Sequence, residues 1–74
     1  MMTKDVNHRD ENGMTPLLYA IFVGDVARVR ELLADGADPN LPVDGSMPLW
    51  YAEDDFGLDE IAQLLRAAGA RKTL

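Results

Sequence analysis

The fold of this chain is decided by the stretch Asp10-x-x-Gly13-x-Thr15-Pro16-Leu17-x-x-Ala20-x-x-x-Gly24. Its central triplet Thr15-Pro16-Leu17 returns 32 residues later as Met47-Pro48-Leu49. The other positions that return are Ala20 as Ala52, Val29 as Ile61, Leu32-Leu33 as Leu64-Leu65, and Gly36-Ala37 as Gly69-Ala70. A self-similar period of about 33 residues is typical of helical repeat arrays. The period therefore predicts a protein that binds along a surface, rather than one that works in a catalytic pocket.

Local signals predict a pair of helices in the first copy. Thr15 is suited to the N-cap of a helix, and Pro16 to its first turn, so a helix is expected from there to about Val23. Gly24 then turns the chain. The turn dipeptides Asn12-Gly13 and Asp44-Gly45 indicate hairpin-like loops.

A second helix is expected from about Val26 to Asp35, with Asp25 as its cap. Its apolar residues Val29, Leu32 and Leu33 fall on one face. Gly36 is the expected left-handed terminator.

With Val29, Leu32-Leu33, Gly36-Ala37-Asp38 and Asn40 added, the opening stretch closely resembles one whole ankyrin repeat. A looser copy runs from about Asp44 to Ala70, and Asp5-Val6-Asn7 echoes Asp38-Pro39-Asn40. The resemblance implies an all-α, ankyrin-type solenoid of two helix-turn-helix repeats with hairpin loops. It is expected to form one domain over residues 1–74, with repeat 1 at about 10–40 and repeat 2 at about 41–71. Residues 1–4 are expected to be a loose end, and the echo leaves open a repeat truncated at the N-terminus.

The second copy departs from the first at specific places. Met47 replaces the capping threonine, so Met47→Thr is expected to stabilise the protein by about 0.5–2 kcal/mol. Phe56 takes the place of Gly24, and the glycine moves to Gly57. Polar residues on the last helix are typical of a capping repeat, which must face water on one side.

Composition limits the possible partners. The chain has 74 residues, no cysteine and a formal net charge of −6. An acidic surface repels phosphate, which argues against nucleic-acid binding and favours a basic protein partner, unless the charge serves only solubility. Without an apolar leader or a membrane-length apolar run, the chain is expected in the cytoplasm, away from membranes.

The sequence offers little for catalysis, and we expect neither enzymatic activity nor a cofactor or metal site. His8 stands in a polar loop without a second ligand, and Ser46 has no motif around it. The acidic run Glu53-Asp54-Asp55, followed by Asp59 and Glu60, lacks the spacing of a calcium loop. Its two remaining interpretations are a solvated helix end and a contact patch for arginine or lysine from a partner.

Trp50 occupies the position where the family usually has a histidine, and Leu18 holds that position in the first copy. The missing histidines put the family's hydrogen bonds between loops in doubt. Trp50 either fills the gap or forms a partly exposed anchor of the kind enriched at interface hot spots. Tyr19 and Tyr51 are expected in the core.

The resemblance implies binding through loop tips and the exposed end of the inner helices. Of these positions, Phe22 and Val23 would form a small apolar patch beside acidic groups. The predicted partner-binding residues are Arg9, Glu11, Asn12, Met14, Phe22, Val23, Val43, Asp44, Ser46, Trp50, Asp54 and Asp55.

The expected function is protein binding, in the form of a small inhibitor or immunity-type protein that occludes its partner. The alternative is a scaffold fragment of a longer ankyrin-repeat protein. Because about three repeats are normally needed for stability, two repeats also leave a homo-oligomer open.

Overall fold

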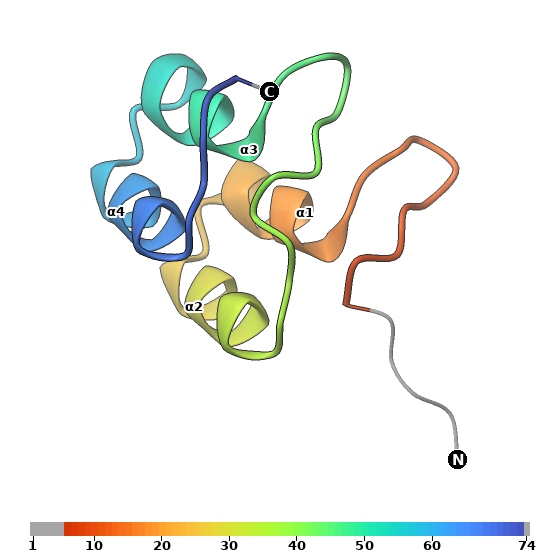
Figure 1. Cartoon of the computed structure of the whole chain (residues 1–74), viewed down its shortest axis with the longest axis horizontal. Helices are drawn as coiled ribbons and strands as arrows, with labels where there is room; N and C mark the ends of the chain where they lie inside the picture. The colour runs from red at the N-terminus through yellow and green to blue at the C-terminus, as the bar shows by residue number, and fades with distance from the viewer. Residues whose placement is uncertain (1–5, 74) are drawn as a thin grey trace.

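The computed structural model describes residues 6–73, so the expected loose end at residues 1–4 and Asp5 of the echo lie outside the described residues. Four stretches of α-helix and one π-helical turn follow one another (Figure 1). They are α1 (Pro16–Val23), α2 (Val26–Ala34), α3 (Pro48–Trp50), the π-helical turn η1 (Tyr51–Asp55) and α4 (Asp59–Ala67). We call α1 and α2 the first helix pair, and α3 with η1 and α4 the second helix pair. The two pairs stack side by side, which confirms the predicted all-α repeat architecture.

Both helices of the first pair begin at side-chain caps. The Thr15 hydroxyl accepts a hydrogen bond from the Leu18 amide at 3.2 Å, and the Asp25 carboxylate accepts one from the Arg28 amide at 3.0 Å. Gly24 ends α1 with a φ of 73°, a left-handed conformation that glycine adopts without steric cost. These local signals place the helices where the sequence predicts them.

The second pair accommodates one more residue than the first. Eight steps separate Pro16 from Gly24, whereas nine separate Pro48 from Gly57. The extra residue is absorbed by η1, in which the Phe56 amide donates to the Tyr51 carbonyl at 2.9 Å. Such wide turns occur mostly as single-turn bulges within α-helices. Gly57 then ends the turn with a φ of 65°.

The wide turn leaves the next helix in its proper place. The Asp25 amide donates to the Ala20 carbonyl at 2.9 Å before α2 begins. The Leu58 amide donates to the corresponding carbonyl of Ala52 at 2.6 Å before α4 begins. The inserted residue therefore changes the turn without shifting the helix that follows.

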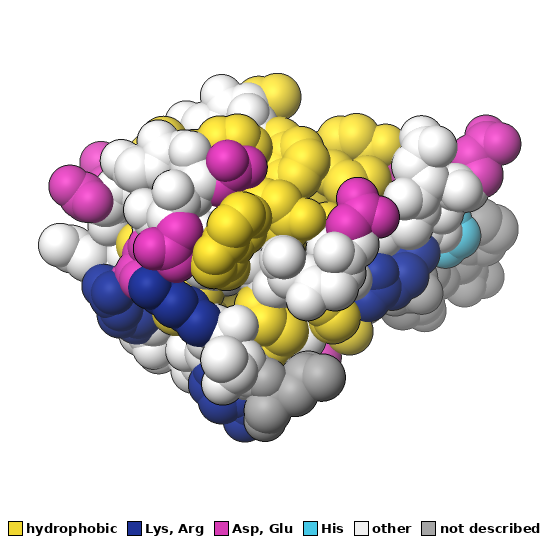
Figure 2. All heavy atoms as spheres, turned by 90° about the horizontal axis from the view of Figure 1, so that it is seen from above, with side chains coloured by type: hydrophobic (Ala, Val, Ile, Leu, Met, Phe, Trp, Pro, Cys, Tyr) yellow, Lys and Arg dark blue, Asp and Glu magenta, His cyan; other side chains and the backbone are white. Residues whose placement is uncertain are grey.

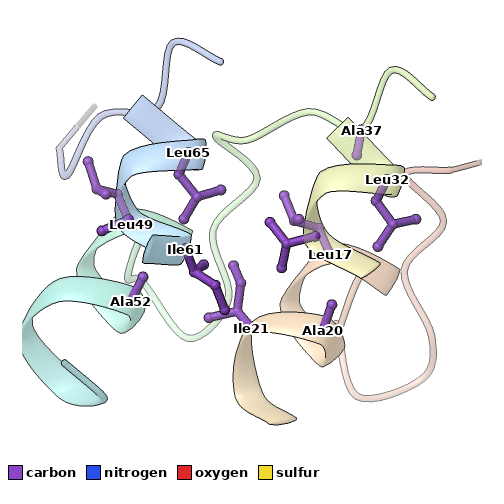
Figure 3. Close-up of a cluster of buried hydrophobic side chains, with 11 residues drawn as sticks. Leu17, Ala20, Ile21, Leu32, Ala37, Leu49, Ala52, Ile61 and Leu65 are labelled. Atoms are coloured by element: carbon purple, nitrogen blue, oxygen red, sulfur yellow. The ribbon is translucent and has the colours of Figure 1, made fainter. Parts of the chain in front are cut away.

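One apolar core runs through both helix pairs (Figure 3). Each fully buried leucine or isoleucine contributes roughly 1.5–3 kcal/mol by leaving water. Because each pair covers the apolar face of the other, neither would bury its core side chains alone. The cluster comprises Leu17, Ala20, Ile21, Val29, Leu32, Ala37, Leu49, Ala52, Ile61, Ala62 and Leu65.

Met47 belongs to the buried side chains, with only 3% of its surface exposed. As predicted, it provides no side-chain cap to α3. Its burial means that a threonine placed there would gain a cap but would also remove packed apolar volume. Met47→Thr therefore exchanges buried apolar packing for a helix cap, and the burial of Met47 argues against the predicted stabilisation.

Two asparagines tie successive repeats together through the backbone. The Asn7 side-chain oxygen accepts from the Asp38 amide at 2.7 Å, and the Asn40 oxygen accepts from the Arg71 amide at 2.8 Å. The Asn40 amide group also donates to the Gly69 carbonyl at 3.1 Å. Each bond to a backbone amide spans 31 residues, so we call these contacts the asparagine ladder.

Candidate functional site

Four aromatic rings meet on the surface where the two helix pairs adjoin. Phe22, at the end of α1, lies 5.1 Å from Tyr51 and 5.2 Å from Phe56, measured between ring centroids. The rings of Trp50 and Tyr51 lie 5.1 Å apart. These three pairs are edge-to-face, a favourable arrangement for aromatic side chains. We call Phe22, Trp50, Tyr51 and Phe56 the aromatic cluster.

The aromatic cluster is open to solvent. Phe22 and Phe56 are each 40% exposed and Trp50 is 37% exposed, while neighbouring Val23 is 75% exposed. Together with Tyr19 they account for every large exposed hydrophobic side chain among residues 6–73. Figure 2 shows hydrophobic side chains gathered in a band across one face, with acidic groups beside it. Such a concentration of apolar surface on one face marks a candidate interaction site.

Acidic side chains accompany the aromatic cluster on η1 and on the neighbouring hairpin. Asp54 is paired with Lys72 at 3.0 Å. Asp55 and Asp44 are exposed and make none of the ion pairs formed within residues 6–73. Asp55 of the predicted acidic run and Asp44 of the hairpin are therefore carboxylates without an ion-pair partner in the described part of the chain.

Glu53 behaves differently from the rest of that run. Counted from the start of each pair, it takes the place of Ile21, which is fully buried. Its side chain is only 13% exposed and pairs with Arg66 and with Lys72, the latter at 2.8 Å. A carboxylate at so enclosed a position needs partners of opposite charge. For Glu53, the interpretation as a solvated helix end is wrong.

Tyr19 of α1 and Tyr51 of η1 occupy equivalent positions, and each binds the hairpin of its own repeat. The Tyr19 hydroxyl donates to the Asp10 carboxylate, and the Tyr51 hydroxyl donates to the Val43 carbonyl at 2.9 Å. These bonds tie each hairpin to its own repeat, although the family's histidine is missing from both. Tyr19 is 46% exposed, so its expected place in the core is wrong, and Tyr51 is half-buried.

The Tyr19–Asp10 hydrogen bond also affects ionisation. It lowers the pKa of Asp10, with help from the Met14 amide at 3.0 Å, because both donors favour the charged carboxylate. The same bond raises the pKa of Tyr19.

The hairpin residues predicted to bind a partner divide into exposed tips and structural contacts. Asp44 and Gly45 both have positive φ, of 51° and 79°, as a two-residue hairpin turn requires. Val43 and Ser46 exchange backbone hydrogen bonds across this turn at 3.0 Å. Val43 is 6% exposed, so the structure contradicts its assignment as a partner-binding side chain.

Arg9 links the two hairpins, because its guanidinium donates to the carbonyls of Gly13 and Pro42 at 2.9 and 2.6 Å. Glu11 and Asn12 are exposed at the first hairpin tip, whereas Met14 is half-buried. The hairpin tips thus remain predicted contact points. Arg9 holds the two hairpins in a fixed relation to each other through its hydrogen bonds.

A charged hollow lies apart from the aromatic cluster, against η1 and α4. It measures about 370 Å³ and is lined by Glu53, Asp54, Asp59, Ala62, Gln63 and Arg66. Two of its charged groups, Glu53 and Arg66, are paired with each other. Residues 6–73 hold no group of three or more histidine or carboxylate side chains placed to bind a metal ion. Nor does any helix in this part of the chain have the length and apolar character needed to cross a membrane.

The sequence predicted part of the aromatic cluster and missed the rest. The sequence predicts Phe22 and Val23 as an apolar surface patch, and Trp50 either as a residue that fills a gap or as a partly exposed anchor. The structure brings Phe22 and Trp50 into one cluster with Tyr51. From the sequence, Phe56 is only a residue that stands in the place of a glycine. The displaced glycine was the available signal, because it indicated an insertion that had to be accommodated nearby.

Comparison with known proteins gives one consistent result. A family model described as ankyrin repeats, in three copies, matches residues 1–74. The ankyrin repeat protein YahD of Escherichia coli K12 is 46% identical over 72 residues, covering 89% of this chain and 35% of that protein. Human ankyrin repeat family A protein 2 is 53% identical over 36 residues, covering 49% of this chain and 12% of that protein. The chain thus spans well under half the length of these relatives. The family model counts three copies, whereas residues 6–73 hold two helix pairs.

Proposed function

Because the chain belongs to the ankyrin repeat family, we propose that it works without catalysis, by binding another protein. Ankyrin repeats generally mediate protein–protein interaction, through extended surfaces made by stacked repeats. The observation that carries the proposal is the aromatic cluster, exposed on the inner helices of both pairs. Residues 1–74 would act as one domain, with repeats at about 10–40 and 41–71.

The composition of this surface supports a protein partner. Tryptophan and tyrosine dominate the binding energy of many interfaces, especially when packed neighbours exclude water around them. Trp50 and Phe22 are partly exposed and are held by ring contacts to Tyr51, so they are preorganised for contact. Acidic groups around an apolar centre give the usual arrangement of an interface core and its polar rim.

The mode of action that we propose is occlusion, in which the chain covers a functional site of its partner as a small inhibitor or immunity-type protein. Its compact, acidic surface suits the rapid capture of a basic partner. The alternative is a scaffold segment of a longer protein, favoured by the small share of its relatives that this chain spans. In that case the partner would remain active in the complex.

The test begins with affinity capture of the partner from cells of the source organism, using the parent chain and Trp50→Ala in parallel. Binding to the purified partner is then measured by calorimetry. If Trp50 is a hot spot, Trp50→Ala should cost about 2 kcal/mol or more of binding free energy. Arg30→Ala, on the exposed side of α2, is the matched control and should bind like the parent.

Circular dichroism must first show that both variants fold like the parent. Equal binding of Trp50→Ala and the parent would contradict the proposed surface. Assaying the captured partner separates the two modes of action, because an inhibitor abolishes its activity and a scaffold preserves it.

A further inference from the structure

The extra residue of the second helix pair adds Phe56 to the aromatic cluster. Without an insertion, α3 would continue as a regular helix to a glycine at the place equivalent to Gly24. The wide turn η1 instead allows Phe56 to precede Gly57, and it places this ring 5.2 Å from Phe22 of the first pair. The insertion thus adds a second aromatic contact between the two repeats, beside that of Phe22 with Tyr51.

The chemistry beside these rings favours cations. Aromatic faces attract arginine and lysine side chains, and the attraction strengthens as the contact is desolvated. Asp55 directly precedes Phe56 and is exposed, without an ion pair in the described part of the chain. Asp44, equally unpaired there, projects from the adjacent hairpin. A cation bound over the rings could therefore be neutralised by a neighbouring carboxylate.

We propose that the aromatic cluster binds a positively charged segment of the partner protein, in which arginine or lysine side chains alternate with apolar ones. The apolar side chains pack on Phe22 and Phe56, while the cations contact the aromatic faces and Asp55. This inference rests on the proposed function and adds the chemistry of the partner. A second copy of the chain fits less well, because each copy carries a net charge of −6 and pairing would bring the acidic groups together.

The protein carries its own reporter for a direct test. Trp50 is its only tryptophan and belongs to the aromatic cluster, so intrinsic fluorescence reports binding there. The probes are four short synthetic peptides that share the same leucine and serine residues. At the remaining positions, one peptide has arginine, one lysine, one glutamine and one glutamate. The arginine peptide should bind at least roughly tenfold more tightly than the glutamine peptide, a difference of about 1.4 kcal/mol. The glutamate peptide should bind most weakly.

Matched charge reversals separate a specific site from general attraction. Asp55→Lys and Glu31→Lys change the net charge equally, but Glu31 lies on α2, where it pairs with Arg28. Only Asp55→Lys should weaken binding of the arginine peptide. Equal weakening by both variants would overturn the proposal, because it would show that net charge alone attracts the peptide.

Substitutions of Phe56 test the rings themselves. Phe56→Leu keeps an apolar side chain and removes the aromatic face, whereas Phe56→Ser removes both. Binding of the arginine peptide should fall with Phe56→Leu and fall further with Phe56→Ser. Unchanged binding by either variant would overturn the proposal, as would an arginine peptide that leaves Trp50 fluorescence unchanged. Circular dichroism should show parent-like folding for both variants, since Phe56 is 40% exposed.

Two further outcomes distinguish this inference from the proposed function. If the captured partner requires Trp50 but the peptides bind alike, the cationic chemistry is wrong and protein binding stands. If the four peptides bind with the expected differences in affinity but the captured partner binds Trp50→Ala as it binds the parent, the proposed partner surface is wrong. Sedimentation analysis completes the test, since a dimer disrupted by Phe56→Ser would make a second copy the occupant.

Discussion

The two helix pairs differ in the interactions that hold their helices in place. In the first pair, Thr15 and Asp25 cap the two helices, and Ile21 fills the core. In the second pair, the residues at the cap positions, Met47 and Leu58, make no side-chain cap. Glu53 stands where Ile21 would be, held by ion pairs.

This difference shows two ways of building the same unit. The first helix pair is specified by local signals, each of which acts within a few residues. The second depends mainly on packing against the first. The ion pairs of Glu53 and the acidic residues in the first turn of α4, which face the positive end of the helix dipole, make smaller contributions. This second pair carries the wide turn η1 and three of the four rings of the aromatic cluster.

The largest expected effect comes from the position at which the two pairs differ most. Ile21→Ala should destabilise the protein by about 2–5 kcal/mol, because it leaves a cavity in the shared core. Glu53→Ala should cost about 1 kcal/mol or less, since its partners Arg66 and Lys72 are 57% and 42% exposed and water screens their charges. Urea unfolding followed by circular dichroism measures both, and equal losses would show that the two positions contribute alike.

A smaller effect is expected at the cap position of the second pair. Met47→Thr would restore a cap worth about 1 kcal/mol, but truncating a buried methionine costs about 2–5 kcal/mol. We therefore expect a net loss of about 1 kcal/mol or more, the opposite of the expectation from sequence. A higher midpoint of denaturation in the variant would show that capping outweighs packing here.

A cap of the first pair can be removed without changing the core. Asp25→Ala deletes the acceptor for the Arg28 amide and should cost about 0.5–2 kcal/mol. Asp25→Asn keeps an acceptor and serves as the control. If both variants lose the same stability in thermal unfolding, the charge of Asp25 matters more than its hydrogen bond.

The smallest effect concerns the hydroxyl that ties the first hairpin to α1. Tyr19→Phe removes the donor that lowers the pKa of Asp10, so this pKa should rise toward its ordinary value in an NMR titration. A lowered pKa stabilises the folded state above the ordinary value, and this contribution is lost as the pH falls through the folded value. Tyr19→Phe should thus lose stability at neutral pH and resemble the parent in strong acid. An unmoved Asp10 titration would contradict this assignment.

The sequence predicted the features that depend on nearby residues. Thr15, Asp25 and Gly24 carry their signals within one turn of helix, and the repeat period placed the second pair by analogy. The sequence did not predict η1, because an inserted residue can lengthen a helix, widen a turn or extend a loop. The choice depends on contacts such as Phe22 with Phe56, which join residues far apart in sequence.

The site was harder to predict than the fold for the same reason. The resemblance to ankyrin repeats predicts Phe22 at the surface and Trp50 either filling a gap or partly exposed. The pairing of Glu53 with Arg66 and Lys72 required the position of α4 and of the chain beyond it. Burial of Val43 likewise reflects packing that its hairpin position does not reveal.

The asparagine ladder joins successive units of the chain by the same hydrogen bond each time. Asn7 and Asn40 each reach a backbone amide 31 residues ahead, so the joint does not depend on which side chains lie between them. The segment from Asn7 to Asn40 therefore begins and ends with an asparagine that makes the same kind of hydrogen bond. Because stacked repeats contact only their neighbours, an array joined in this way can lengthen by whole units without a change in the joint.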